Sequence, residues 1–483
     1  MKRNLTAKET IAITSMLFGM FFGAGNLIFP AKLGIDAGSS MWSAFLGVFV
    51  TAVGIPMLAV VALGLSRSEG VVELSGRVSR KYSLFFCTAL YLTIGPLFAI
   101  PRCASTAFSV GAVNLLPEGH EGLFLAGFSL IFFAVVLLFS LKPGGIMTWI
   151  GKWLNPVFLV FLATLVIAAL VNPVTKISAV APAEGYASVG GAFFRGFLEG
   201  YNTLDALAGL AFGIVVIDVV RTHGVTQPER VAVNTAKAGI FSCLFMGLIY
   251  LCITLISTQS APICAGADNG GAVLGLIANH YFKAAGSILM TLIVTFACLK
   301  TAIGLVTSCS KAFVDMFPKG PGYSVWAVIF SVVSFGIANF GLSSIVAWCV
   351  PVLMFLYPLA ITLVLLALFG KFYQNDQRVY VTTTAFTLVA AVFDMIGSLS
   401  GMLPGSNLLA GLTRFAGKIL PLYSLGLGWV FPAAIGFLAG LWMVKRKKLY
   451  KGLLPRKGGR PFFVVPCMSK RCHCEKRSDV AIP

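Results

Sequence analysis

The sequence predicts an all-α polytopic membrane protein with about twelve transmembrane helices. Of its 483 residues, 58% are hydrophobic and 11% are charged, and the mean hydropathy is +0.91. This composition is too apolar for a soluble chain of that length. The apolar runs are long enough to cross a hydrocarbon core of about 30 Å, which takes about 20 residues each. They fall near residues 10–30, 41–65, 83–113, 122–141, 146–171, 193–220, 231–257, 284–310, 324–346, 347–369, 379–403 and 424–444.

Basic residues gather in alternate loops between these runs. One set of loops carries most of the Lys and Arg residues, from Lys2 and Arg3 at the start to residues 445–448 near the end. The opposite set carries few of them, together with acids such as Asp36 and Glu184. By the positive-inside rule, both termini are expected in the cytoplasm. The net charge of +19 is therefore a topology signal, and no nucleic-acid partner is expected.

The chain divides into a membrane domain, residues 1–448, and a basic tail, residues 449–483. The tail is rich in Gly, Pro, Lys and Arg, and we expect it to be disordered and cytoplasmic. Its Cys and His residues lack the spacing of a zinc site, because ligands usually stand two to four residues apart in pairs. No resident metal is expected at Cys467, Cys472, His473 and Cys474.

The first helix-breaking stretch is FFGAGNLIFP, residues 21–30, within the first apolar run. Its centre holds Gly23, Ala24, Gly25 and Asn26. Each glycine weakens a helix by roughly 1 kcal/mol, and an Asn in hydrocarbon needs protein or ligand groups as partners for its amide. The sequence therefore predicts that the first membrane helix is discontinuous here.

A second interruption occurs in the sixth apolar run, in LEGYNTLDALAGLAFG, residues 198–213. Its polar residues are Glu199, Tyr201, Asn202, Thr203 and Asp205. Polar groups at membrane depth are costly and usually line a binding site or a pathway. The sixth helix is therefore expected to be discontinuous as well.

The two interrupted helices are five spans apart and so cross the membrane in opposite directions. A five-helix unit repeated once would then be inverted, and a pair of broken helices at corresponding places indicates the binding site of a secondary transporter. An alternative is that Gly23 and Gly25 only let another helix pack closely. In the transporter interpretation, freed carbonyl groups hold a cation, and the N-terminus of a half-helix favours a carboxylate.

Five blocks of the sequence resemble the branched-chain amino acid:cation symporters, the system II carriers for leucine, isoleucine and valine. The blocks are GAGNLIFP (23–30), YLTIGPLFAIPR (91–102), GYNTLDALAGLAFGIVV (200–216), ACLKTAIGLVTSCS (297–310) and VPVLMFLYPLAI (350–361). The resemblance runs from about Thr6 to Lys448. It implies a leucine-transporter-like fold: ten core helices in two inverted five-helix repeats, with discontinuous helices 1 and 6, plus two further helices.

The resemblance also implies import of branched-chain amino acids through the bacterial inner membrane, coupled to a sodium ion or a proton, with no resident cofactor. The expected partners are the amino acid, the coupling cation and the lipid bilayer. The expected substrate-binding residues are Gly23, Ala24, Gly25, Asn26, Tyr201, Asn202, Thr203 and Asp205. The expected cation-coupling residues are Ala24, Asn26, Thr203, Ala297, Lys300 and Thr301.

Lys300 departs from the family pattern, which has a small, apolar or hydroxyl residue at that position. It lies beside Thr301, where the resemblance places a second cation site. Counting from Lys311 at about 1.5 Å per residue puts Lys300 roughly 16 Å inward, near the midplane. We expect either that its ammonium replaces the second sodium ion and couples transport to protons, or that it faces a wet cavity or marks an inactive copy.

Arg102 has two interpretations. Counting about 1.5 Å per residue from Tyr82 puts it roughly 30 Å up the third span, near the outer surface. There we expect it to snorkel to the interface. The alternative is an outer gate in which Arg102 pairs with Glu199 or Asp205.

Two other function classes compete with the carrier for branched-chain amino acids. One is a proton-coupled carrier of another small apolar amino acid. The other is a membrane-embedded enzyme such as a transferase, which would need acids, bases or metal ligands gathered near one interface. The cytoplasmic loops carry scattered Arg and Lys with few carboxylates, so we expect no enzyme.

Overall fold

The computed structural model describes residues 4–23, 25–66, 68, 70–110, 120–141, 146–403 and 405–453. Ala24, one of the expected site residues, lies outside this part of the chain. So do the tail residues Cys467, Cys472, His473 and Cys474.

Helices dominate the described residues. The first nine are α1 (Ala7–Phe21), α2 (Gly25–Ala37), α3 (Met41–Val48), α4 (Ile55–Ser66), α5 (Val71–Gly76), α6 (Arg80–Leu92), α7 (Ala99–Val110), α8 (Glu121–Ser140) and α9 (Ile146–Val171). The others are α10 (Val189–Glu199), α11 (Asp205–Thr222), α12 (Pro228–Gln259), α13 (Gly270–Met316), α14 (Tyr323–Ala338), α15 (Leu342–Phe369), α16 (Gln377–Met402), α17 (Asn407–Ile419) and α18 (Val430–Leu453).

Short helical turns join several of these helices. They are Gly38–Ser40, Phe49–Gly54, Thr93–Leu97, Ile177–Ala179, Gly200–Thr203, Ala261–Cys264, Gly370–Tyr373 and Tyr423–Leu425. Phe49–Gly54 and Thr93–Leu97 are π-helical turns, and each joins two helices of one membrane span.

Seven continuous helical stretches of the described chain are long and apolar enough to cross a membrane, and one bent pair of helices raises the total to as many as eight. The seven are Gly25–Ser66, Arg80–Val110, Glu121–Ser140, Glu229–Gln259, Met290–Met316, Leu342–Tyr373 and Gln377–Met402. The chain is therefore a multi-pass membrane protein.

The predicted boundary between the ninth and tenth spans, at residues 346 and 347, is wrong. Helix α14 ends at Ala338 and α15 begins at Leu342. Gly341 has a φ of +80°, a left-handed conformation that glycine adopts without a steric penalty. The chain turns there, inside what hydropathy alone presents as one apolar run.

Both helices that the sequence predicts to be discontinuous are broken. Helix α1 ends at Phe21 and α2 starts at Gly25. In the sixth span, α10 passes into the turn Gly200–Thr203, Leu204 adopts a φ of 66°, and α11 begins at Asp205. The two parts of this span are bent by 44°.

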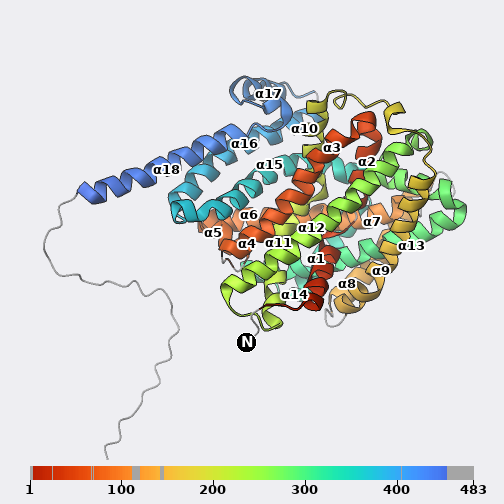
Figure 1. Cartoon of the computed structure of the whole chain (residues 1–483), viewed down its shortest axis with the longest axis horizontal. Helices are drawn as coiled ribbons and strands as arrows, with labels where there is room; N and C mark the ends of the chain where they lie inside the picture. Colours follow the sequence, from red (N-terminus) through yellow and green to blue (C-terminus); the bar gives the residue numbers. More distant parts are fainter. Residues whose placement is uncertain are drawn as a thin grey trace, which may run out of the picture. The chain divides into compact units, whose positions relative to one another are not determined.

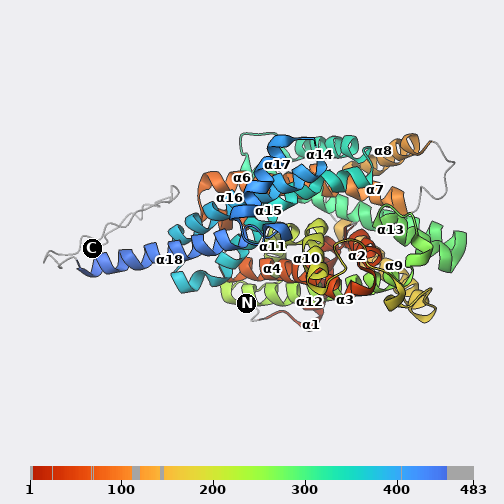
Figure 2. The same cartoon turned by 90° about the horizontal axis from the view of Figure 1, so that it is seen from above.

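The broken helices lie among long continuous ones. In Figures 1 and 2, α4, α11 and α12 lie side by side, and α7 lies next to α13. Helix α12 also packs against α1 and α2, and α13 packs against α2. Both halves of the first span are therefore held by α12.

Glycines allow the closest of these helix contacts. A Cβ added at Gly196 of α10 would lie 2.0 Å from the backbone oxygen of Ala44 in α3, and one at Gly47 of α3 would lie 2.1 Å from that of Phe193. Real Cβ atoms do not approach oxygen so closely, so only glycine fits at both crossings. This contact fixes α10, the first half of the broken sixth span.

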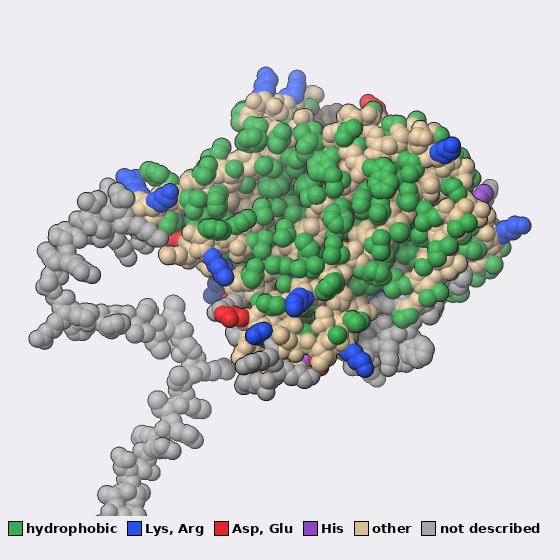
Figure 3. All heavy atoms as spheres, in the orientation of Figure 1, with side chains coloured by type: hydrophobic (Ala, Val, Ile, Leu, Met, Phe, Trp, Pro, Cys, Tyr) green, Lys and Arg blue, Asp and Glu red, His purple; other side chains and the backbone are tan. Residues whose placement is uncertain are grey.

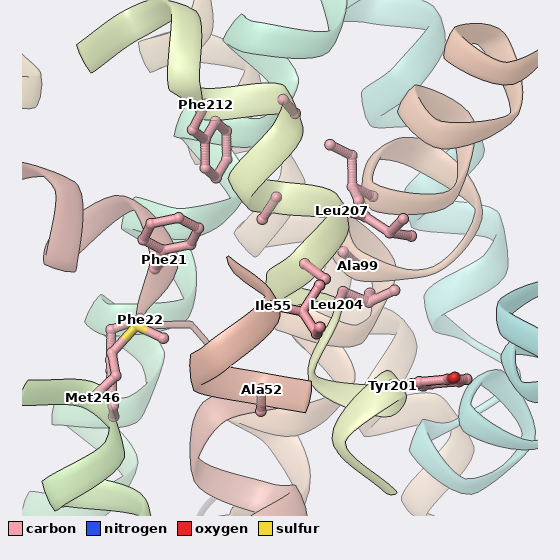
Figure 4. Packing of buried hydrophobic residues seen from close by; sticks show 14 of the residues in the cluster. Phe21, Phe22, Ala52, Ile55, Ala99, Tyr201, Leu204, Leu207, Phe212 and Met246 are labelled. Carbon is pink, nitrogen blue, oxygen red and sulfur yellow. The ribbon is translucent and has the colours of Figure 1, made fainter. Parts of the chain in front are cut away.

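Figure 4 shows how apolar side chains fill the space around the two breaks. Phe21, the last residue of α1, faces Phe212 of α11, with ring centroids 6.1 Å apart and ring planes at 68°. Phe22 lies beside Met246 of α12, and Leu204 of the second break packs near Ile55 of α4. The backbone polar groups that the breaks release are thus surrounded by protein.

Large hydrophobic side chains also cover much of the surface. Figure 3 shows one face with a broad apolar area, around which most Lys and Arg side chains lie toward the periphery. Helix α8 exposes Leu123 and Ile131, and α12 exposes Leu248. In water such surfaces would aggregate, whereas in a bilayer they contact lipid.

Compact packing divides the chain into Met1–Val444 and Lys445–Pro483. The sequence placed the boundary between residues 448 and 449, inside α18. Residues 449–453 are helical, and the remainder of the predicted tail lies beyond the described part of the chain.

Candidate functional site

A cavity of about 40 Å³ lies between the two helix breaks. Seven of its lining residues are glycines or have polar side chains, namely Gly23, Gly25, Asn26, Arg102, Thr203, Asp205 and Thr301. The other lining residues are almost all apolar, among them Met20, Phe21, Ile94, Ala208, Phe212 and Leu305. The structure therefore brings the first break, the second break, α7 and α13 to one place.

Asn26 connects the two broken spans. Its Nδ2 donates to Asp205 Oδ1 at 2.9 Å and Oδ2 at 3.0 Å, and its Oδ1 accepts from the Gly23 backbone N–H at 2.7 Å. Asn26 and Asp205 are 2% and 1% exposed. The Asn26 side chain thus supports the start of α2 and satisfies the carboxylate at the start of α11.

Tyr250 of α12 completes this cluster. Its hydroxyl donates to Asp205 Oδ2, and Asn26 Nδ2 also donates to the Tyr250 oxygen. The carboxylate of Asp205 lies at the N-terminus of α11, where the helix dipole favours negative charge. These donors together offset the cost of burying a carboxylate.

Arg102 enters the cavity from α7. It is 4% exposed, and its Nη1 donates to the backbone oxygen of Asn202 at 2.7 Å. Its Cζ lies 5.0 Å from the ring centroid of Phe29. The expectation that Arg102 snorkels to the membrane surface is therefore wrong.

The helix containing Arg102 is not straight, which explains this error. Gly95 has φ and ψ of −99° and −126°, and it lies with Pro96 in the π-helical turn Thr93–Leu97. Proline removes a backbone hydrogen bond and bends a helix. Counting 1.5 Å per residue from Tyr82 assumes a straight helix, and this assumption fails at Gly95.

Arg102 forms no ion pair within 4.0 Å with Asp205 or Glu199 among the described residues. Glu199 is half-buried and accepts a hydrogen bond of 2.9 Å from Asn202 Nδ2. The proposed outer gate between Arg102 and these acids is not formed in this structure, and it stays a prediction.

The Thr203 side chain forms hydrogen bonds to nearby backbone groups within the second break. Its Oγ1 donates to the Gly200 backbone oxygen at 2.9 Å and accepts from the Asp205 backbone N–H at 3.4 Å. Asn202 contributes its backbone oxygen to Arg102 but does not line the cavity. Of the expected residues of this stretch, Thr203 and Asp205 therefore reach the cavity.

Tyr201 points away from the cavity. Figure 4 shows its ring directed toward the neighbouring helices, and it stacks on Tyr357 of α15 with ring centroids 4.1 Å apart and ring planes at 19°. It is 2% exposed and does not line the cavity. The geometry gives it a role in packing the break against α15.

Helix α13 contributes Thr301 to the first break. Thr301 Oγ1 is 3.3 Å from the Phe22 backbone oxygen and 3.1 Å from that of Ala297. A Cβ added at Gly23 would lie 2.9 Å from Thr301 Cγ2. Three oxygens therefore lie together where α1 ends, and the second cation site expected there stays a prediction.

Lys300 is half-buried in α13 and is not among the residues that line the cavity. Successive residues of an α-helix project about 100° apart, so Thr301 and Lys300 cannot present the same face to α1. Ala297 takes part through its backbone oxygen. The sodium-replacing role of Lys300 stays a prediction.

Sequence reasoning missed Tyr250. A single tyrosine in the apolar run of residues 231–257 gives no local signal of a site, because aromatic residues are common in buried helices. Its hydrogen bond to Asp205 forms because α12 packs beside α2 and α11 in the fold.

The arrangement offers opposite charges at opposite ends of broken helices. Asp205 lies at the N-terminus of α11, and the guanidinium of Arg102 meets a carbonyl at the end of the preceding half-helix. The unpaired backbone groups at these ends carry partial charges of the opposite sign, positive at the N-terminus beside Asp205 and negative at the carbonyl end beside Arg102. Such an arrangement has the chemistry to bind small charged or zwitterionic groups, and its apolar walls can accept a hydrocarbon side chain.

Comparisons with known proteins show the family to which the chain belongs. The sequence pattern of the family described as "Branched-chain amino acid transport protein" matches residues 6–447. The branched-chain amino acid permease BrnQ of Lactobacillus delbrueckii subsp. lactis is 51% identical over 440 residues, which cover 90% of this chain and 97% of that protein. BrnQ of Bacillus subtilis (strain 168) is 37% identical over 440 residues, covering 91% and 98% of the two chains.

Among solved structures, the chain is similar to Mhp1, a nucleobase-cation-symport-1 family transporter in a closed conformation with bromovinylhydantoin bound. The TM-score is 0.57 and the sequence identity is 14%, with 91% of this chain and 93% of that chain covered. At this identity the likeness concerns the fold alone. It fits a leucine-transporter-like arrangement of the helices.

Proposed function

Because this chain belongs to the branched-chain amino acid transport protein family, we propose that it imports leucine, isoleucine and valine by alternating access, coupled to a sodium ion or a proton. The observation that carries the proposal is the cavity between two broken membrane helices, with polar groups at the breaks and apolar side chains around them. Family membership places the chain among transport proteins, not among membrane-embedded enzymes.

The cavity walls suit a branched aliphatic side chain. Phe21, Ala208, Phe212 and Leu305 present hydrocarbon to it. A charged side chain placed among them would lose its hydration without a partner, at a cost of several kcal/mol. Lysine and glutamate are therefore poor substrates in this proposal.

The cavity as it stands has room for a few water molecules, since its volume is about 40 Å³, and is too small for leucine. Substrate entry therefore requires movement of side chains or helices. Discontinuous helices allow this in carriers, because each half can move about the break.

Twelve spans and an inverted five-helix repeat fit this mechanism. In this proposal, α1 with α2, α9, α14 and α18 supply the spans beyond the seven or eight stretches of the described chain that are long and apolar enough. The breaks between α1 and α2 and between α10 and α11 occur in the first and sixth of the predicted runs. With an even number of spans, both termini lie on one side, which the basic loops indicate to be the cytoplasmic side of a bacterial inner membrane.

Two observations bear on the coupling ion. Thr301 Oγ1 and the backbone oxygens of Phe22 and Ala297 form an oxygen cluster that suits sodium. Lys300, one residue away, brings an ionisable group to the same helix. We therefore keep both sodium and proton coupling in the proposal.

The test is uptake of radiolabelled leucine into proteoliposomes that contain the purified protein. Sodium and proton gradients are imposed separately, and protein-free liposomes are the control. We expect saturable accumulation that isoleucine and valine inhibit and that lysine and glutamate do not. Absence of uptake of all three branched-chain amino acids under either gradient would overturn the proposal.

A further inference from the structure

Arg102 is a buried cation that the helix breaks leave only partly satisfied. One of its nitrogens donates to the Asn202 backbone oxygen at 2.7 Å, and its Nε has no hydrogen-bond partner among the described residues. A guanidinium has five N–H donors, and burying it is costly unless they are used. The unused donors belong to a side chain that lines the cavity.

The same cavity contains a buried carboxylate. Asp205 is 1% exposed and also lines it, yet Asp205 and Arg102 form no ion pair within 4.0 Å. Opposite charges in a low-dielectric cavity attract strongly, and a direct pair would leave little for a ligand to bind. The structure instead supports the carboxylate separately, through Asn26 and Tyr250.

Two separated opposite charges beside an apolar cavity match a free amino acid, whose carboxylate and ammonium are adjacent. We propose that Arg102 binds the α-carboxylate of the transported amino acid and that Asp205 lies on the side of its ammonium. This inference rests on the proposed function and identifies the residue that makes the site select zwitterions. Arginine suits the task because its planar fork can bind both oxygens of a carboxylate.

Gly25 provides the space in which the Arg102 guanidinium lies at the edge of the cavity. A Cβ added there would lie 2.5 Å from Arg102 Nη2 and 3.3 Å from the Thr203 backbone oxygen. The absence of a side chain lets the guanidinium lie against the start of α2, where free backbone N–H groups also favour a carboxylate. The two kinds of donor therefore converge on one region of the cavity.

A competing role is that of a permanent clamp, in which Arg102 only holds the carbonyl end of the second break. A clamp would support binding of every ligand to the same extent. A carboxylate anchor would support only ligands that carry a carboxylate. Leucine and leucinamide separate the two roles, because they share the side chain and the ammonium and differ at the carboxylate.

The experiment measures binding of leucine and leucinamide to the purified full-length protein in detergent. In the wild type, leucinamide should bind at least roughly tenfold more weakly than leucine, since a hydrogen-bonded carboxylate contributes 1.5–3 kcal/mol. Arg102→Gln should weaken leucine binding by roughly 10- to 100-fold and leave leucinamide binding almost unchanged. Arg195→Gln, a matched change at an exposed arginine of α10, should change neither.

Arg102→Lys is a second variant in case Arg102→Gln does not fold. It keeps the positive charge and loses the planar guanidinium. It should fall between wild type and Arg102→Gln in its preference for leucine. Equal weakening of leucine and leucinamide in both variants, or full retention of the preference, overturns the inference.

Failure of the proposed function gives a different result. If the wild type binds no branched-chain amino acid, that function is wrong, and the role of Arg102 is then decided with other apolar amino acids and their amides. A preference for the acids that disappears in Arg102→Gln supports the inference. Binding of no amino acid at all overturns it as well.

Discussion

The Asn26 amide donates to both carboxylate oxygens of Asp205, at 2.9 and 3.0 Å, and so joins the second residue of α2 to the first residue of α11. Each of these helices begins directly after a break in its span. Their N-termini, which favour negative charge, therefore meet at one carboxylate. A movement of either half-helix changes the surroundings of Asp205, which links the geometry of the breaks to the site.

The first prediction concerns this network. Asn26→Ala and Tyr250→Phe each remove a donor to Asp205, and each should weaken leucine binding by roughly 10-fold or more, because hydrogen bonds to charged groups contribute about 1.5–3 kcal/mol. Since both act on the same carboxylate, their effects should not add, and a double-mutant cycle on the dissociation constant should give a coupling of about 0.5–3 kcal/mol.

Tyr82→Phe is the matched control, because the Tyr82 hydroxyl of α6 has no hydrogen-bond partner within the described part of the chain. It should leave leucine binding and thermal stability nearly unchanged. Strictly additive effects of Asn26→Ala and Tyr250→Phe would show that the two side chains do not act through Asp205.

The second prediction concerns Gly25. Gly25→Ala forces the Arg102 guanidinium to move, since the new Cβ would lie 2.5 Å from Nη2. The displaced guanidinium loses its contact with the Asn202 oxygen, and overpacking of this kind costs about 1–3 kcal/mol. Leucine affinity should fall roughly tenfold, and Gly25→Leu should abolish binding while the protein still inserts in the membrane.

Gly127→Leu is the control for this change. Gly127 lies on the exposed face of α8, and no atom of the described residues lies within 4 Å of an added Cβ. It should bind leucine like the wild type. Normal leucine affinity in Gly25→Ala would mean that the space over Gly25 is not needed for the site.

The sequence predicted the helix breaks well and the surroundings of the site less well. Gly23, Gly25 and Asn26 weaken a helix by their own chemistry, so a break there needs no knowledge of the fold. Arg102 was misplaced because the kink at Gly95 is a backbone property that counting residues along a straight helix ignores. Tyr250 could not be found, because its hydrogen bond to Asp205 joins residues 45 positions apart.

The third prediction concerns the coupling ion. If the Lys300 ammonium takes the place of the second sodium ion, leucine uptake by the wild type is driven by a proton gradient. Lys300→Thr should then convert uptake from proton-dependent to sodium-dependent, because it removes the positive charge and supplies a hydroxyl. The measurement is leucine uptake into proteoliposomes with each gradient imposed alone.

Lys311→Thr serves as the control, since Lys311 is an exposed lysine of the same helix. It should keep the ion dependence of the wild type. A wild type that is strictly sodium-driven, with a pH dependence that Lys300→Thr does not change, would contradict the prediction.

The fourth prediction concerns the position of the sodium ion. It is tested in the protein whose leucine uptake depends on sodium, which is either the wild type or Lys300→Thr. Thr301→Val removes the hydroxyl that lies 3.3 Å from the Phe22 oxygen and keeps the shape of the side chain. Loss of one oxygen ligand should raise the sodium concentration for half-maximal uptake by roughly tenfold and leave the preference among leucine, isoleucine and valine unchanged. Thr307→Val is the control, because the Thr307 hydroxyl lies farther along α13 and no described residue is its hydrogen-bond partner. If both threonine variants responded to sodium equally, the oxygen cluster at the end of α1 would not be the sodium site.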